Sequence, residues 1–237
     1  MSGGFRFKQF AVEQERSAMK VGTDGVLLGA WAALDQGHRR VLDVGTGTGL
    51  IALMAAQRTA EWGAKIVGVE IERESYLDAQ ANCAASPWAD RISLFCGPIQ
   101  EFEAEEPFDH ILSNPPYFVN SLTSPNQART TARHTTSLSF EQLASDAERL
   151  LAPEGVLSVV LPTDAVADMT LAAARRGLFL RRRLDVSSKR GGRPLRALLT
   201  YGRKALPTEV EHLTIHEPDG SYTEPYRLLT RDFYLKF

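Results

Sequence analysis

The sequence contains little cysteine, no long apolar run and almost no net charge. Its two cysteines, Cys83 and Cys96, have neither metal-ligand spacing nor the density of a disulfide framework. We therefore expect two buried thiols in a reducing compartment, and no bound metal. No apolar run reaches membrane-spanning length, and residues 1–8 lack the apolar core of a signal peptide. These absences favour a cytoplasmic protein without a membrane segment.

The remaining composition favours one α/β domain. The chain has 237 residues, of which 43% are hydrophobic, so it can bury a substantial core. Apolar strand patterns alternate with helical patterns over short connections, which predicts a mostly parallel sheet with helices on both faces. Ser139 and Gln142 form a predicted capping box at the start of a helix. We expect Thr23 and Thr163 to cap two further helices.

A glycine-rich turn follows the first predicted strand of this sheet, residues 41–45. Asp43, Gly45, Gly47 and Gly49 lie between that strand and an apolar helix, as at the opening of a βαβ unit. The spacing differs from the dinucleotide fingerprint, which excludes a dehydrogenase. A second strand ends at Glu70, where a carboxylate can accept hydrogen bonds from both ribose hydroxyls of a nucleoside cofactor.

A second motif, Asn114-Pro-Pro-Tyr117, follows an apolar run at residues 108–112. The prolines fix their own φ angles, and Pro115 also favours an extended Asn114. The Asn114 amide oxygen and the Pro115 carbonyl can then accept both hydrogens of an amino group stacked on Tyr117. Such acceptors stabilise an amine that loses its conjugation as it attacks an electrophile. Taken alone, the motif also suits an ordinary turn.

Together these motifs resemble a class I S-adenosylmethionine-dependent methyltransferase that methylates amino groups. Residues 7–10, 19–31 and 231–235 further resemble the tRNA1(Val) (adenine-37-N6)-methyltransferases. The resemblance implies a Rossmann-like α/β fold with a seven-stranded, mostly parallel sheet and an antiparallel edge strand. It implies S-adenosyl-L-methionine as cofactor, held by Asp43, Gly45, Gly47, Gly49, Glu70 and Asn114. It implies tRNA as substrate, with Asn114, Pro115 and Tyr117 at the reacting amine.

The resemblance also implies how one domain, residues 1–237, is divided. Residues 1–38 would cover the cofactor, residues 39–204 would form the Rossmann-like core, and residues 205–237 would add a carboxyl-terminal strand and extension. No obligate protein partner is implied.

One position departs from the family pattern. Many relatives carry an acid after the third strand that contacts the adenine of the cofactor, and here Pro98 occupies that place. Backbone groups, Gln100 or apolar packing must then recognise the adenine.

Other functions stay open on the sequence alone. A protein glutamine amide would fit the same Asn-Pro-Pro-Tyr pocket, although the release-factor enzymes of that kind usually carry a helical domain ahead of the glycine motif. DNA adenine methylation would need a target-recognition region, and no such insertion is evident. A non-catalytic RNA-binding scaffold would have no use for Asn114 or Glu70. His134 reads as a solvated loop residue rather than a catalytic base.

Charge is distributed unevenly along the chain. Residues 175–204 contain eleven cations against one acid, whereas residues 61–109 contain eleven acids against three cations. This predicts a basic end and an acidic end of the sheet, which suits a phosphate-bearing partner. The residues that we expect to contact the RNA backbone are Lys189, Arg190, Arg193, Arg129 and Arg133. A solvated face with salt bridges is the alternative.

Overall fold

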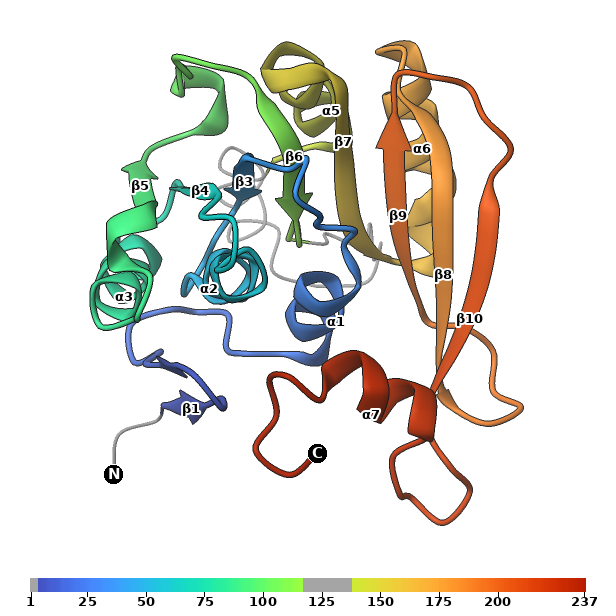
Figure 1. Cartoon of the computed structure of the whole chain (residues 1–237). Coiled ribbons are helices and arrows are strands. Elements are labelled where there is room, and N and C mark those ends of the chain that lie inside the picture. Colours follow the sequence, from blue (N-terminus) through green and yellow to red (C-terminus); the bar gives the residue numbers. More distant parts are fainter. Residues whose placement is uncertain (1–3, 117–137) are drawn as a thin grey trace, which may run out of the picture.

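The structure, a computed structural model, describes residues 4–116 and 138–237 (Figure 1). Its centre is an eight-stranded sheet. In spatial order the strands are β10 (Glu209–His216), β8 (Phe179–Lys189), β9 (Arg196–Gly202), β7 (Leu151–Pro162), β6 (Phe108–Ser113), β3 (Arg40–Val44), β4 (Lys65–Glu70) and β5 (Ile92–Cys96). A separate hairpin pairs β1 (Phe5–Arg6) with β2 (Ala11–Val12).

The predicted Rossmann-like, mostly parallel sheet is confirmed, and two of its details differ. β9 is antiparallel to both of its neighbours, β7 and β8, so the antiparallel strand lies inside the sheet and not at its edge. β10 pairs in parallel with β8 and forms the edge, which gives eight strands among the described residues where seven were expected. The sequence pattern of β10 hid this pairing because Glu209–His212 are exposed and mostly polar.

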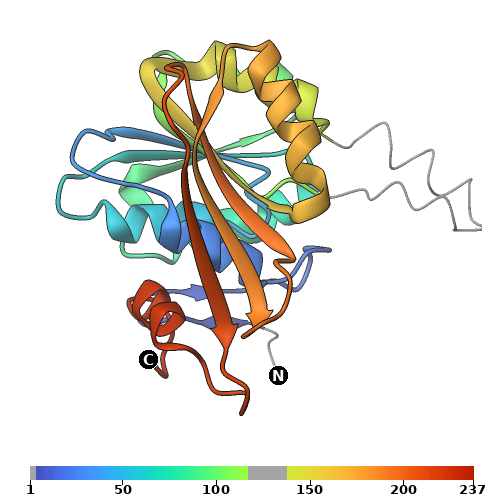
Figure 2. The same ribbon diagram turned by 90° about the vertical axis from the view of Figure 1, so that its right-hand side faces the viewer.

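Helices cover both faces of the sheet (Figure 2). The six described helices are α1 (Thr23–Trp31), α2 (Leu50–Arg58), α3 (Arg73–Ala84), α5 (Phe140–Leu150), α6 (Val166–Arg175) and α7 (Glu224–Thr230). Single 3-10 turns form at η1 (Ala89–Arg91), η2 (Ile99–Glu101) and η3 (Thr163–Ala165). Side chains of α1, α2 and α7 share one hydrophobic cluster, and those of α5 and α6 share a second. The sheet thus separates two apolar layers.

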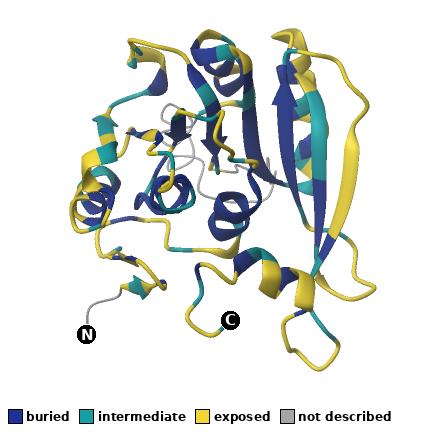
Figure 3. Ribbon diagram, in the orientation of Figure 1, coloured by how far each residue is buried: buried dark blue, intermediate teal, exposed yellow. Residues whose placement is uncertain are grey.

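The central strands are buried on both faces, whereas β10 is largely exposed (Figure 3). Val41, Leu42 and Val44 of β3 are all buried, and so is Asp43 between them. Burial on both faces explains why these strands read as continuous apolar runs without alternation. A carboxylate in such a strand must be held by specific partners, because an unpaired buried charge is strongly destabilising.

Local predictions had mixed outcomes. The capping box is confirmed, because Ser139 accepts from the Gln142 backbone and Gln142 accepts from the Ser139 backbone. The two threonine caps are wrong: Gly22 precedes α1 without a side-chain cap, and Thr163 starts η3 and donates to the Pro194 carbonyl. Both helices are set by packing, which a local capping pattern does not report. The burial of Cys83 is confirmed, whereas the predicted burial of Cys96, at the end of β5, is wrong.

A buried network of hydrogen bonds connects the segment after α1 to three strands of the sheet. His110 of β6 donates to the Ala33 carbonyl, and its other ring nitrogen accepts from Ser158 of β7 at 2.9 Å. Ser158 in turn contacts Thr200 of β9 at 2.8 Å. Burial lowers the pKa of His110 to about 3, so the ring is neutral and fits this alternation of donors and acceptors. This hydrogen-bond network fixes the position of α1 beneath the sheet.

Candidate active site

Three sequence motifs meet at the carboxyl edge of the sheet. Val44 of β3 is in register with Val69 of β4 on one side and with Ser113 of β6 on the other. Gly45, Glu70 and Asn114 therefore follow at the same level on three adjacent strands, which lie about 4.8 Å apart. The chain runs outward from β3 through β4 to β5 and then returns to β6. Strand order thus reverses between β3 and β6, where ligands bind in open α/β sheets.

The turn from β3 into α2 requires glycine. Gly45, Gly47 and Gly49 have φ angles of 70°, 57° and 83°, which side chains rarely adopt. A Cβ at Gly45 would meet no atom within 4 Å, so this backbone borders open space. A Cβ at Gly49 would instead meet the Cys83 sulfur at 3.3 Å, because here the turn packs on α3. The first two glycines therefore expose backbone to a ligand, and the third allows the turn to pack closely against α3.

Asp43 holds this turn from inside. It is fully buried, and its Oδ2 accepts from the Thr46 hydroxyl at 2.5 Å and from the Ala52 backbone at 3.0 Å. Burial raises the pKa of Asp43 to about 7, against the opposing effect of these two bonds. Its Oδ1 has no hydrogen-bond partner among the described residues. An unpartnered buried carboxylate oxygen beside an open glycine turn suits a ligand that carries a donor.

Glu70 holds the same turn from the neighbouring strand. One carboxylate oxygen accepts from the Gly47 backbone and the other from the Glu72 backbone, both at 2.8 Å. Burial raises the pKa of Glu70, while these backbone donors lower it. Each carboxylate oxygen has a second lone pair, so Glu70 retains the capacity to accept from ribose hydroxyls. The sequence indicated the ribose role but not the role in shaping the loop.

Asn114 lies half-buried immediately after β6. The preceding Ser113 is buried and donates to the Val44 carbonyl at 2.8 Å, which fixes the end of β6 against the end of β3. Pro115 is buried and Pro116 exposed. Tyr117 lies outside the described residues, so the predicted stacking surface stays a prediction.

Ile71 was not identified from the sequence. It directly follows Glu70 and is 48% exposed, an unusual position for a large apolar side chain at the end of a buried strand. Its place beside Glu70 provides apolar surface for a planar ring. Gly97, on the adjacent strand end, is held by a bond from its backbone to the Glu70 carbonyl. Apolar packing is thus available where Pro98 replaces the expected acid.

Two buried polar residues of α3 were also missed. Asp78 accepts from the backbones of Arg16 and Ser17, and Asn82 pairs with the backbone of Glu13. Asn82 also donates to the Thr48 carbonyl in the glycine turn, at 2.9 Å. The amino-terminal segment is therefore attached directly beside the turn. The available signal was their four-residue spacing, which places both polar side chains on one helix face.

Comparisons with known proteins agree with this geometry. The family model "Methyltransferase small domain" matches residues 26–179. A tRNA1(Val) (adenine(37)-N6)-methyltransferase from Phocaeicola vulgatus is 48% identical over 98% of this chain and 97% of its own. Proteins of the same name from Bacteroides thetaiotaomicron and Yersinia enterocolitica are 46% and 43% identical, over 98% and 99% of this chain and 97% and 94% of their own. The chain belongs to the tRNA1(Val) (adenine(37)-N6)-methyltransferase family.

Solved structures agree in fold. A predicted O-methyltransferase from Agrobacterium tumefaciens superposes with a TM-score of 0.66 at 22% identity, covering 89% of this chain and 96% of its own. A methyltransferase from Streptomyces caelestis gives a TM-score of 0.55 at 17% identity, covering 78% and 91%. At these identities the likeness shows the class I methyltransferase fold alone.

Exposed cations are candidates for contact with tRNA phosphates, and many of those predicted here are paired. Seven of the eleven cations between residues 175 and 204 form ion pairs with acids of this chain. Arg190 is held by both oxygens of Glu217, at 2.9 and 2.8 Å. Lys189 and Arg193 are exposed in the same turn, and neither has an ion pair among the described residues. Arg129 and Arg133 lie outside those residues.

The described residues contain neither a membrane-spanning helix nor a metal-binding cluster. No helix there is long and apolar enough to cross a membrane. Within residues 4–116 and 138–237, no cluster of three or more His, Cys, Asp or Glu side chains could hold a metal ion.

We expect Asp43→Asn to change how stability depends on pH. The pKa of Asp43 is about 7 in the folded protein and about 3.9 in an unfolded chain. Its contribution to stability is therefore complete below about pH 4 and is lost as pH rises through 7. The free energy of unfolding of wild type minus that of D43N should fall over this window by up to about 1.4 kcal/mol per pH unit. Urea titrations between pH 4 and 8.5 measure this difference in the free energy of unfolding.

Asp168→Asn is the matched control, because Asp168 is exposed on α6. Parallel curves for wild type and D43N between pH 4 and 7 would contradict the raised pKa.

Proposed function

We propose that this protein transfers a methyl group from S-adenosyl-L-methionine to N6 of an adenine in tRNA, with adenine 37 of tRNA1(Val) as the target. The observation that carries the proposal is the position of Asn114, which follows β6 directly beside the glycine turn after β3. An amine acceptor and a candidate nucleoside-binding turn thus lie side by side at one edge of the sheet. The near full-length likeness to enzymes named for this reaction supports the choice of substrate.

The described residues fit the cofactor. Gly45 and Gly47 present backbone to open space, Asp43 offers an unpartnered oxygen, and Glu70 has lone pairs left for ribose hydroxyls. Ile71 supplies apolar surface for the adenine ring, which Pro98 cannot contact by a polar side chain. Once bound, S-adenosylmethionine supplies a methyl group already activated by its sulfonium. The protein then needs to position the amine rather than to generate a strong nucleophile.

Asn114 and Pro115 perform that positioning. The side-chain amide oxygen of Asn114 and the backbone carbonyl of Pro115 accept hydrogen bonds from the exocyclic amine of adenine. The lone pair of this amine is otherwise delocalised into the ring. These bonds become stronger as the nitrogen turns tetrahedral and gains positive charge, so they stabilise the transition state more than the ground state. With the cofactor bound, the nitrogen would gain the methyl group as the methyl–sulfur bond breaks and its electron pair stays on sulfur, and the nitrogen would release one proton to water. Tyr117, which lies outside the described residues, is predicted to stack on the base.

The rest of the chain has supporting roles in this proposal. Residues 39–204 form the core, and residues 205–237 add β10 and α7 to it. Residues 1–38 cover the cofactor, which the attachment of residues 13–17 to Asp78 and Asn82 supports. From the tRNA substrate we infer a cytoplasmic location.

A direct test uses labelled S-adenosylmethionine and total tRNA that lacks the modification, followed by nucleoside analysis. Wild type should form N6-methyladenosine. Asn114→Ala should reduce kcat by at least about 100-fold, the effect of removing one transition-state acceptor, and change the cofactor Kd less than about five-fold. Glu70→Ala should instead weaken the cofactor by roughly 10- to 100-fold, because charged hydrogen bonds are lost.

Label on a co-purified protein in place of tRNA would redirect the proposal to a glutamine amide. A large loss of cofactor affinity in N114A with unchanged kcat would remove Asn114 from the reacting centre.

We also expect Arg193→Ala to weaken tRNA binding and to reduce the slope of log K against log salt by about one, the signature of one lost phosphate contact. Arg190→Ala should have a smaller effect, because Glu217 already holds that guanidinium. Lys204→Ala is the control of equal charge, since Lys204 lies beyond the opposite end of β9 and pairs with Glu154. An unchanged slope in R193A would exclude this turn from the interface.

A further inference from the structure

A cavity of about 550 Å³ is lined by residues other than Asn114 and the glycine turn. Part of its lining is an aromatic wall, formed by the side chains of Phe5, Tyr222, Tyr226, Tyr234 and Phe237. Tyr222 packs against His216 and Tyr226, with ring centroids 4.9 and 5.2 Å apart, and Phe237 meets Tyr222 edge-on at 5.0 Å. Tyr222 is still 44% exposed. This volume is within the range of small-ligand sites.

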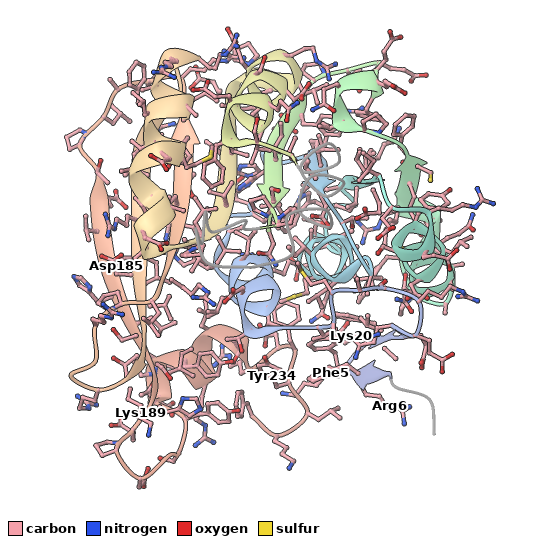
Figure 4. The ribbon with its side chains drawn as sticks, turned by 180° about the vertical axis from the view of Figure 1, so that it is seen from behind. Phe5, Arg6, Lys20, Asp185, Lys189 and Tyr234 are labelled. Carbon is pink, nitrogen blue, oxygen red and sulfur yellow. The ribbon has the colours of Figure 1, made fainter. Side chains whose placement is uncertain are left out.

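The two ends of the chain build this cavity together (Figure 4). Phe5 and Tyr234 lie with ring centroids 6.2 Å apart, although they come from opposite ends of the sequence. Lys8 fixes the arrangement: its backbone donates to the Phe233 carbonyl, and its ammonium donates to the carbonyls of Arg231 and Phe237. The aromatic wall is therefore a formed surface of the fold.

Cations border the aromatic wall. Arg6, Arg196 and Lys236 line the cavity, against Asp24 as the lining acid. Asp24 is neutralised by its ion pair with Arg196 at 2.8 Å, which leaves Arg6 and Lys236 in excess. The cationic turn of Lys189 and Arg193 begins beside the cavity, since Ser188 and Leu195 also line it. Aromatic surface edged by positive charge suits a planar ring attached to a phosphate.

The cavity also lies close to the strand end that carries Asn114. Thr23, Asp24 and Leu27 of α1 line it, while Gly25 of the same helix packs against Leu50, the first residue of α2 after the glycine turn. Arg196 pairs with Pro162 of β7, and β7 pairs with β6. Two strand spacings and about two residues along β7 separate Asn114 from Arg196, a distance of roughly 10–15 Å. A single strand that places one base at Asn114 can reach the cavity with a near neighbour.

We propose that this cavity binds an unpaired nucleobase of the substrate RNA, one that flanks the methylated adenine, against the aromatic wall, with Arg6 and Lys236 facing its phosphates. The proposal rests on the function proposed above. Loop bases that are not paired can be turned outward and stacked on aromatic side chains, which is how proteins usually recognise RNA loops. The site would therefore select an adenine by its position within a loop.

The test measures binding of a fluorescently labelled stem–loop with the sequence of the tRNA1(Val) anticodon arm, in the presence of S-adenosylhomocysteine. Each loop nucleotide other than the target is replaced in turn by an abasic one. One replacement should weaken binding to wild type by about 5- to 100-fold, the effect of losing one base–aromatic stack. The same replacement should change binding to the Tyr222→Ala variant less than about two-fold, because this variant lacks the ring on which the base stacks.

Two variants separate stacking from folding. Tyr222→Phe keeps the ring and should bind as wild type, and Phe179→Ala removes an exposed aromatic from the opposite end of β8 and should also bind as wild type. The abasic series on wild type does not depend on how Y222A folds. The proposal is overturned if no flanking position loses affinity, or if the loss persists fully in Y222A.

Methylation of the intact stem–loop is measured in parallel. Absence of methylation with retained coupling between Tyr222 and one base rejects the enzymatic proposal and supports the cavity. Methylation without coupling between Tyr222 and a base supports the enzymatic proposal and rejects the cavity as a base-binding site.

Discussion

The left-handed turn between β3 and α2 is the constraint on which the functional edge depends. Three residues in this turn have positive φ, and two acids hold them there from different strands: Asp43 through Thr46 and Ala52, and Glu70 through the Gly47 backbone. Both carboxylates are buried, and burial raises the pKa of each. The two acids that we propose bind the cofactor therefore also shape the glycine turn, so removing either one should affect both the turn and cofactor binding.

The polar residues beneath this edge determine how the chain ends are placed. Asp78 and Asn82 attach residues 13–17 to α3 next to the turn, and Lys8 attaches the amino-terminal hairpin to the carboxyl-terminal segment. Most of these bonds join a side chain to a distant backbone group. Asp78 and Asn82 are buried, and a buried polar group left without a partner is costly, so these two residues fix the path of residues 13–17. The aromatic cavity follows from this arrangement.

Many of the surface cations form ion pairs with acids of the same chain. The basic stretch of residues 175–204 and the acidic stretch of residues 61–109 lie at opposite ends of the sheet, as the sequence predicted. Seven of the eleven cations are nevertheless paired within the chain, mostly with acids from other stretches such as Glu211 and Glu217. A count along the sequence therefore overstates the charge available to a phosphate backbone. Exposed ion pairs are weak, however, and a polyanion can compete for their cations.

The sequence by itself determined the class of fold, the family and the strand ends that bear Asp43, Glu70 and Asn114. These features are local: a glycine with positive φ, an acid at a strand end and a proline-restricted asparagine leave direct marks in the pattern. Only the tertiary structure decided that β9 lies inside the sheet, that Ile71 is exposed beside Glu70, and that Phe5 meets Tyr234. Each of these depends on which distant segments pack together. Periodicity reports which residues are buried, not which partner buries them.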